Sequence, residues 1–170
     1  MTETRLTLKK ASVVKSWLDF LYYELGKQRY DFYLCKLTKN AAGDIRATKW
    51  QTYSQVCFGL NHWETPDVNQ RQILPFEIVL DLEEMWGLDP IIERLMKASN
   101  PFRVFLTGSR GYHIHIYFDE VGTEEEKMAF IKEFGGDTMK AYTKSLIALE
   151  FVSHWKSGKR KEMIFEHGFK

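Results

Sequence analysis

The segment 104-VFLTGSRGYHIHIYF-118 decides the expected fold, because a turn with two glycines separates two apolar runs in it. The runs 102–106 and 112–118 are rich in β-branched and aromatic residues, and the glycines permit a tight reversal of the chain. We therefore predict an antiparallel hairpin. Alternation along its second strand directs the even-numbered residues into the core and sends His113, His115 and Tyr117 to the opposite face.

Further helices and strands are predicted on both sides of this hairpin. Helical spacing of apolar residues indicates helices over 12–27, 89–98, 123–134 and 138–149. Composition and alternation indicate strands over 29–37, 45–58, 76–83 and 162–168, and the polar segment 61–72 reads as a loop. Asp89 and Thr123 are the expected N-caps. The order predicts an α+β fold, with a largely antiparallel sheet and flanking helices.

Length and composition favour a single soluble domain. The chain has 170 residues, of which 44% are hydrophobic, and its formal net charge is +1. This size allows one sizeable core, and the charge excludes a strongly basic surface overall but not a local basic patch. Only Cys35 and Cys57 are present, so we expect neither a disulfide framework nor a structural zinc site. No apolar run reaches membrane-spanning length, and we expect a cytoplasmic protein without a membrane partner.

Two acidic side chains mark the end of the strand predicted over 76–83. Alternation places Asp81 and Glu83 on the same side of that strand. Two neighbouring carboxylates repel each other unless a cation lies between them, and Mg²⁺ or Mn²⁺ commonly fills that role. The alternative is a strand that simply ends in a solvated acidic edge.

The turn of the hairpin carries an unusual set of donors. Its glycines allow backbone N–H groups to face one side, Thr107 and Ser109 add hydroxyls, and Arg110 adds a forked cation beside His113. Such a set suits a triphosphate. An ordinary hairpin turn would explain the glycines but not the arginine, and a lone His-x-His pair is more often structural than functional.

A third cluster, 154-HWKSGKRK-161, concentrates positive charge in an almost neutral chain and includes His154 and Lys156. A solvated turn with lysines is the plain alternative. Together the acidic pair, the donor-rich turn and the basic turn form a consistent set: metal ions, the phosphates that they bridge, and cations that neutralise the remaining charge.

These motifs resemble the archaeo-eukaryotic primase superfamily, and within it the small catalytic subunit of archaeal and eukaryotic DNA primase. The resemblance is carried by 77-EIVLDLE-83, 106-LTGSRGYHIHI-116 and 153-SHWKSG-158, with weaker similarity at 29-RYDF-32 and 49-KWQTYS-54. It implies one catalytic domain of primase-polymerase type over residues 1–170, with an RRM-like half, a smaller α/β half and the active site between them.

The resemblance also implies a role for individual residues. Asp81 and Glu83 would bind two catalytic Mg²⁺ or Mn²⁺ ions. Asp137 is the best-placed third carboxylate, although it would also make an ordinary N-cap, and Glu150 is the alternative. The incoming triphosphate would meet Thr107, Ser109, Arg110, His113 and His154, with Lys156 beside it. His115 is given no direct role.

Three departures from that family are visible in the sequence. The third metal-binding carboxylate, which normally lies before the late histidine, is represented only by the candidates Asp137 and Glu150. The basic residue that usually precedes that histidine is missing from 148-ALEFVSH-154, and the zinc module is absent from a short chain. A reduced or weakly active member of the family would show these features.

The expected function is that of a primase or primase-polymerase, a nucleotidyltransferase that joins nucleoside triphosphates on a single-stranded DNA template. Its expected partner is a larger primase subunit or replication protein at the nucleoid. Two other functions remain open. One is a rolling-circle type endonuclease that would use His113, His115 and a helical Tyr142 as nucleophile. The other is a non-catalytic accessory subunit that binds nucleotide or single-stranded DNA.

Overall fold

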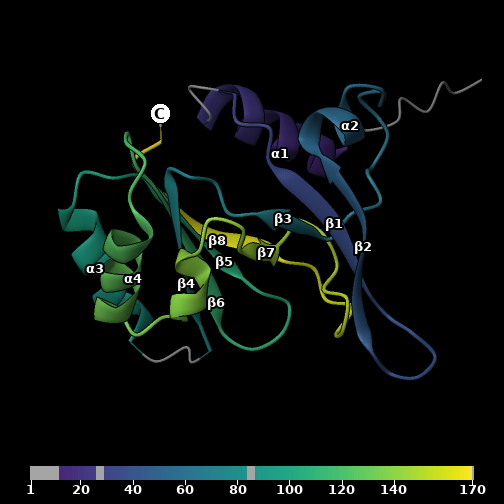
Figure 1. The fold of residues 1–170 in the computed structure, drawn as a ribbon. Helices are drawn as coiled ribbons and strands as arrows, with labels where there is room; N and C mark the ends of the chain where they lie inside the picture. The colour runs from purple at the N-terminus through teal and green to yellow at the C-terminus, as the bar shows by residue number, and fades with distance from the viewer. Residues whose placement is uncertain (1–11, 26–28, 84–86, 170) are drawn as a thin grey trace, which may run out of the picture.

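The predicted hairpin forms in the computed structural model, which describes residues 12–25, 29–83 and 87–169. Strand β5 (Phe102–Leu106) pairs antiparallel with β6 (Tyr112–Tyr117), and Phe105 lies opposite His113. In the described residues the chain is an α+β protein with two four-stranded antiparallel sheets and four α-helices (Figure 1). The fold class is therefore confirmed at this level.

One sheet is built around the hairpin. Its strand order is β4-β6-β5-β8, with β4 over Glu77–Leu82 and β8 over Glu162–His167, as predicted. Helices α3 (Leu88–Lys97) and α4 (Glu124–Glu133) cover one face. The apolar side chains of that face include Ile78, Leu80 and Ile114, which are buried against both helices. Burial of this face leaves the opposite face, with Asp81 and His113, for other contacts.

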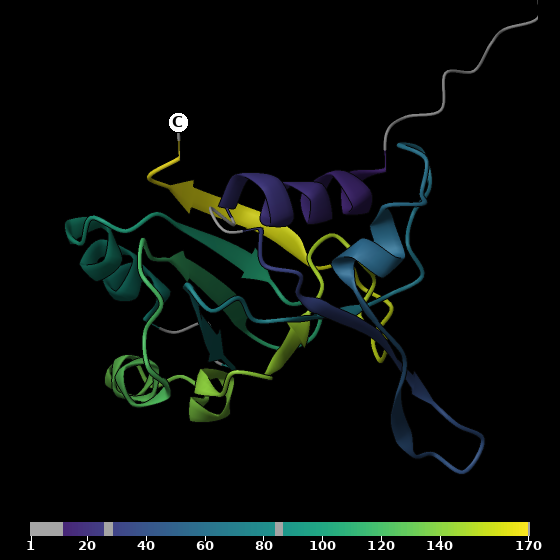
Figure 2. The same cartoon turned by 45° about the horizontal axis from the view of Figure 1, so that its top comes forward.

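The second sheet has the order β2-β1-β3-β7. Its strands are β1 (Tyr33–Lys39), β2 (Ile45–Thr52), β3 (Gln70–Gln72) and β7 (Leu146–Ala148). The β1–β2 hairpin projects beyond the body of the molecule (Figure 2). Helix α1 (Val13–Phe20), followed by a π-helical turn over Leu21–Leu25, and helix α2 (Tyr53–Cys57) form a core with β1 and β5.

The structure corrects three of the predicted elements. Residues 53–57 form α2 rather than the end of a strand, because Thr52 and Gln55 make a capping box. The predicted loop 61–72 contains the buried strand β3. The predicted helix 138–149 is instead a 3₁₀-helix over Thr138–Ala141 followed by β7. In β7 burial alternates with a period of two, as pairing with β3 requires.

Of the two predicted N-caps, one is confirmed and one is corrected. Thr123 caps α4 and forms the expected capping box with Glu126. Helix α3 begins at Leu88 after Gly87, so Asp89 lies inside the first turn and is not the N-cap. The predicted helix 12–27 starts after Ser12, and its last two residues lie outside the described part. No described helix is long and apolar enough to span a membrane.

Candidate active site

Seven of the predicted site residues meet in one pocket of about 320 Å³ at the junction of the two sheets. Strand β4 supplies the acids, the β5–β6 turn supplies the donors, and β7 and the turn after it close the pocket. Its lining consists of Asp81, Glu83, Thr107, Ser109, Arg110, His113, Ala148 and His154. All of them except Ala148 were predicted from the sequence. Lys156 is exposed and is not part of this lining.

Asp81 and His113 form a cross-strand pair at the centre of the pocket. They lie directly opposite each other on β4 and β6, with 3.3 Å between Asp81 Oδ1 and His113 Nε2. Burial, and next the nearby charge of Lys161, lower the pKa of His113 to about 3. The imidazole is therefore neutral at pH 7 and donates its Nε2 proton to Asp81. His113 Nδ1 is buried and has no hydrogen-bond partner among the residues that the structure describes. Because the Nε2 proton is donated to Asp81, the predicted contact of this histidine with a phosphate would compete with that bond.

The carboxylate of Asp81 stays ionised although it is partly buried. Burial raises its pKa, but the hydrogen bond from His113 and the charges of Lys140 and Lys161 outweigh that effect and leave the pKa below its ordinary value. Glu83 follows directly after β4 and is exposed to solvent. The pair thus offers one ordered and one solvated set of carboxylate oxygens.

Gly108 and Gly111 let the β5–β6 turn approach its neighbours closely. Both have positive φ angles, of 80° and 75°. A Cβ atom on Gly111 would lie 1.9 Å from the carbonyl oxygen of Leu82, and one on Gly108 would lie 2.4 Å from that of Lys159. The turn is therefore packed between the end of β4 and the basic turn, which brings Arg110 beside the acidic pair.

Side-chain hydrogen bonds fix the shape of both turns. Thr107 Oγ1 donates to the carbonyl oxygen of Arg110 and accepts from the backbone N–H of Ser109. Its hydroxyl proton is therefore already used inside the turn. In the basic turn, His154 Nδ1 accepts from the backbone N–H groups of Lys156 and Ser157, at 3.2 and 3.3 Å. Nε2 of His154 consequently carries the proton that can be donated to a ligand.

A Gly111→Ala substitution should destabilise the protein and abolish ligand binding in this pocket. The new methyl group would meet the Leu82 backbone and would occupy a left-handed conformation, which together cost about 2–5 kcal/mol of the free energy of unfolding. Gly43→Ala is the matched control, because Gly43 has a φ of 88° and a Cβ atom there would make only an ordinary contact, 3.6 Å from Cε of the Lys39 side chain. Urea unfolding of both variants measures the difference; equal losses would contradict the close approach.

The two candidates for a third carboxylate lie in different environments. Asp137 caps the 3₁₀-helix by accepting from the Met139 N–H, and it lines a neighbouring pocket of about 520 Å³ together with Asp81 and Glu83. Glu150 is fully buried and bonded to Arg71 and Trp17, so it does not face the acidic pair. In the described part, no three His, Cys, Asp or Glu side chains are placed so that they could hold one metal ion.

Behind the pocket, a buried ionic cluster joins the two sheets, and the sequence analysis missed most of it. Arg71 on β3 forms a bidentate pair with Glu77 on β4, with Nη1–Oε1 and Nη2–Oε2 distances of 2.8 and 2.7 Å. The same guanidinium donates to Glu150, with an Nη2–Oε1 distance of 2.7 Å. Burial would raise the pKa of both glutamates, but the charge and hydrogen bonds of Arg71, together with the neighbouring His115, lower it below the ordinary value.

His115 and Lys161 complete this cluster. His115 Nδ1 lies 2.8 Å from Glu77 Oε2, and Lys161 Nζ lies 3.0 Å from His115 Nε2. Since Glu77 accepts and Lys161 donates, the neutral imidazole carries its proton on Nδ1. Burial, followed by the charge of Lys161, lowers the pKa of His115 to about 4. Burial also lowers the pKa of Lys161 to about 8, against the attraction of Glu150. Lys161 therefore belongs to the core and not to the solvated basic turn.

Acid should weaken the fold through the two buried histidines. His113 and His115 have folded pKa values of about 3 and 4, whereas in the unfolded chain both bind a proton near pH 6.5. Between these values the unfolded state holds more protons, so stability falls as pH falls. Between pH 7 and pH 5 the expected loss is on the order of 2 kcal/mol for each histidine.

Urea unfolding at several pH values measures this loss. The His62→Gln variant is the control, because His62 is exposed in the fold and its removal should leave the slope unchanged. A free energy of unfolding that stays flat between pH 7 and pH 5 would contradict the neutral, buried state of His113 and His115.

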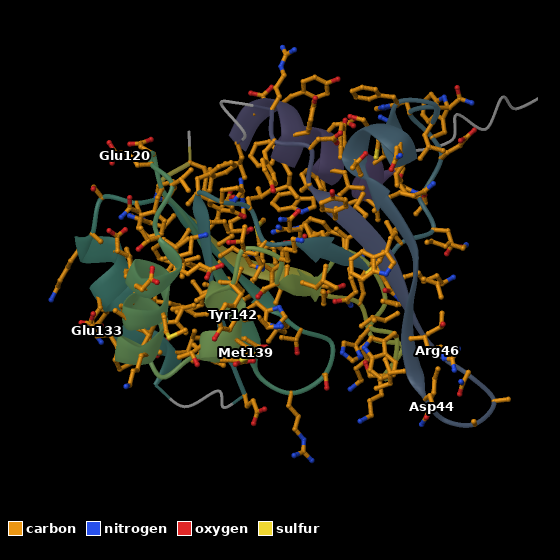
Figure 3. The ribbon with its side chains drawn as sticks, viewed as in Figure 1. Asp44, Arg46, Glu120, Glu133, Met139 and Tyr142 are labelled. Carbon is orange, nitrogen blue, oxygen red and sulfur yellow. The ribbon has the colours of Figure 1, made fainter. Side chains whose placement is uncertain are left out.

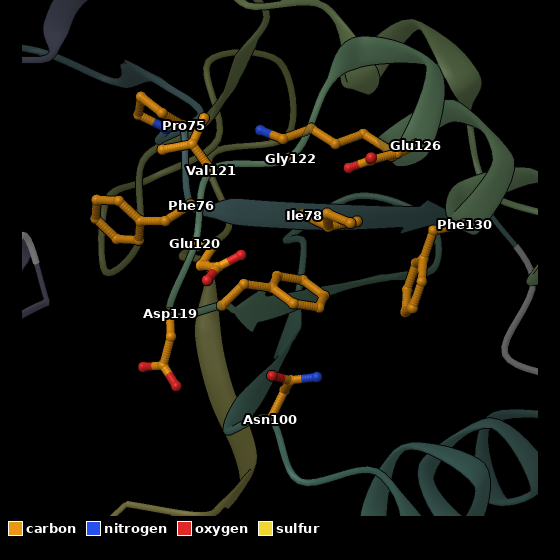
Figure 4. Close-up of a pocket in the computed structure, with 12 residues that line it drawn as sticks. Pro75, Phe76, Ile78, Asn100, Asp119, Glu120, Val121, Gly122, Glu126 and Phe130 are labelled. Atoms are coloured by element: carbon orange, nitrogen blue, oxygen red, sulfur yellow. The ribbon is translucent and has the colours of Figure 1, made fainter.

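Another pocket lies at the opposite end of β4 and contains none of the predicted site residues. Its volume is about 480 Å³, and its lining combines apolar side chains such as Phe76, Ile78 and Phe130 with the acids Glu120 and Glu126 (Figure 4). It is larger than the pocket at Asp81, but it has no donor-rich turn beside its acids. Size alone therefore does not identify the site.

Comparison of the chain with protein-family models, with curated proteins and with solved structures finds no significant match.

Proposed function

We propose that the protein is a nucleotidyltransferase of primase or primase-polymerase type, which adds nucleotides to a strand on a single-stranded DNA template. The observation that carries the proposal is the single pocket in which the acidic pair, the TGSRG turn and His154 meet. These groups come from three segments, with His154 lying 73 residues after Asp81 in the sequence. If these segments were an ordinary acidic edge, hairpin turn and lysine turn, we would not expect all three to line the same pocket.

The donor set at Asp81 and Glu83 fits Mg²⁺ or Mn²⁺. Both ions take oxygen ligands, and Mg²⁺ is usually held by one or two carboxylates together with the phosphates of the substrate. A three-residue protein cage is therefore not required, and Asp81 and Glu83 together with the substrate phosphates would suffice. A bound ion would lower the pKa of the attacking hydroxyl and offset charge on the phosphates.

The residues of the chain bind and orient the substrate. Arg110 would neutralise charge on the triphosphate and His154 would donate its Nε2 proton to a phosphate oxygen, while His113 holds the Asp81 carboxylate in place. The 3′-oxygen of the growing strand forms a bond to the α-phosphorus, its proton passes to solvent, and the bond to the β-phosphate oxygen breaks as pyrophosphate leaves. No covalent enzyme intermediate is needed.

The endonuclease hypothesis has less support from the side-chain positions. His115 uses both ring nitrogens inside the buried cluster, so it is not available beside His113 as a metal ligand. Tyr142, the proposed nucleophile, is not on a helix, because it follows the 3₁₀-helix in extended backbone (Figure 3). The prediction of a helical Tyr142 is therefore wrong.

One assay separates the three functions. The protein is incubated with a primed single-stranded DNA template, labelled nucleotides and Mn²⁺, and the products are resolved by size. Extended product supports the proposal. A protein–DNA adduct that is lost in Tyr142→Phe would support the endonuclease, and nucleotide binding without any product would support the accessory subunit.

A further inference from the structure

A row of side chains crosses the outer face of the second sheet. Thr52 on β2 lies opposite Tyr33 on β1, Tyr33 N–H donates to Gln72 Oε1 on β3, and Gln72 lies opposite Leu146 on β7. The inner face of the same strands carries the buried residues Leu34, Arg71 and Ile147. The outer row is thus supported from below by a rigid core.

Trp50 is held beside this row by a β-bulge. The pairing of β1 with β2 shifts so that Lys49 and Trp50 together oppose Cys35, and Lys49 has a φ of 56°. A non-glycine residue in this left-handed conformation is strained, and bulges often redirect a side chain at a functional site. Trp50 and Tyr33 remain 54% and 47% exposed.

Tyr33 and Trp50 are the aromatic walls of a shallow pocket of about 260 Å³. Its other lining residues are Gln72, Lys144 and Leu146. Exposed aromatic rings beside cations and amides are the combination that binds single-stranded nucleic acid, because bases stack on the rings while cations meet the backbone phosphates. An apolar protein partner would not explain Lys144, because burying its charge against an apolar surface is unfavourable.

The charge of the adjoining hairpin matches such a ligand. Between Tyr33 and Thr52 the chain has four cations and a single acid, Asp44, whereas the net charge of the whole protein is +1. The cations are Lys36, Lys39, Arg46 and Lys49. Asp67 pairs with both Lys36 and Lys49 and offsets part of their charge, whereas Lys39 and Arg46 are exposed to solvent. Arg46 lies toward the far end of the hairpin (Figure 3).

The aromatic pocket and the candidate active site are both lined by residues of β7. Leu146 lines the aromatic pocket and Ala148 lines the pocket at Asp81. Because side chains alternate along a strand, these two residues of β7 share one face and are separated by about 7 Å. A strand of nucleic acid that lies on this face can therefore pass from Trp50 to the acidic pair.

From this placement we infer that Tyr33 and Trp50 form a stacking platform for the single-stranded DNA template, with Lys144 contacting its phosphates. The inference rests on the proposed function, since it names how the same site would hold its template. The platform would also add cation–phosphate contacts, since the turn 154–161 alone offers few of them for binding a template.

Fluorescence anisotropy with a labelled 20-nucleotide oligothymidylate tests the platform in the full chain. Trp50→Ala should weaken binding by between about 5- and 100-fold, the usual effect of losing one stacked base. Trp50→Phe should retain most of the affinity because it keeps an aromatic face. Trp63→Ala is the matched control, because Trp63 is a comparably exposed tryptophan, at 46%, outside this pocket. Thermal unfolding checks that all variants fold.

The outcomes separate this inference from the proposed function. Unchanged affinity in Trp50→Ala, equal losses in Trp50→Ala and Trp63→Ala, or no binding by the wild type overturns the platform. A dimer that Trp50→Ala dissolves, without any DNA binding, also overturns it and assigns the face to a second copy of the chain. If Trp50→Ala loses DNA affinity but the wild-type protein incorporates no nucleotide, the platform stands and the proposed function fails.

Discussion

The Asp81→Asn variant is expected to lose more than about 100-fold of its rate of nucleotide incorporation. Changes in residues that merely support a metal ligand typically cost 10- to 100-fold, and this substitution removes the charge of a ligand itself. Its shape is kept, because Asn can still accept the hydrogen bond that His113 donates to Asp81 at 3.3 Å. Steady-state extension of a primed template in Mn²⁺ measures the rate.

Two further variants make this result specific. Glu120→Gln, in the pocket at the other end of β4, should leave the rate unchanged. Asp137→Asn keeps an equally good N-cap while it removes the charge, so a loss of rate in this variant would assign Asp137 to the metal site. If Asp81→Asn incorporated nucleotides at the wild-type rate, the proposed function would be wrong.

The Arg71→Met variant is expected to lose about 3–5 kcal/mol of the free energy of unfolding. Arg71 is fully buried and neutralises two carboxylates, Glu77 and Glu150, that are also fully buried. Methionine fills part of the volume but leaves both charges without their main partner. Urea unfolding followed by circular dichroism measures the change.

Arg94→Met is the matched control for this prediction. Arg94 pairs with Glu133 at 2.8 Å, but the two side chains are 49% and 63% exposed. An exposed pair of this kind contributes no more than about 1 kcal/mol. Similar losses in Arg71→Met and Arg94→Met would show that the cluster between the sheets does not support the fold as described.

Local patterns in the sequence predicted the parts of the fold that depend on neighbouring residues. The hairpin 102–118 follows from two apolar strands around glycines, and the start of α4 follows from the spacing of Thr123 and Glu126. Helix α2 was missed although Thr52 and Gln55 have the same spacing, because the aromatic residues around them favoured a strand. Strand β7 was taken for a helix, because its pairing with β3 is set by residues far away in the sequence.

In the candidate active site, too, local patterns were predictable and contacts between distant residues were not. The motifs identified Asp81, Arg110 and His154, because each stands in a short pattern with its own chemistry. Arg71 carries no such pattern, since its partners Glu77 and Glu150 lie 6 and 79 residues away. Lys161 is likewise buried because it contacts His115, which lies on a distant strand. Contacts of this kind become visible only in the folded chain.

The central claim is that one pocket binds a nucleoside triphosphate together with divalent ions. A crystal of the protein soaked with nucleotide and Mn²⁺ tests it most directly, because the anomalous signal locates the metal. The account predicts Mn²⁺ beside Asp81 and Glu83, with the triphosphate against the 107–113 turn and His154. Nucleotide bound in the pocket lined by Phe76 and Glu126, or Mn²⁺ away from Asp81 and Glu83, would contradict it.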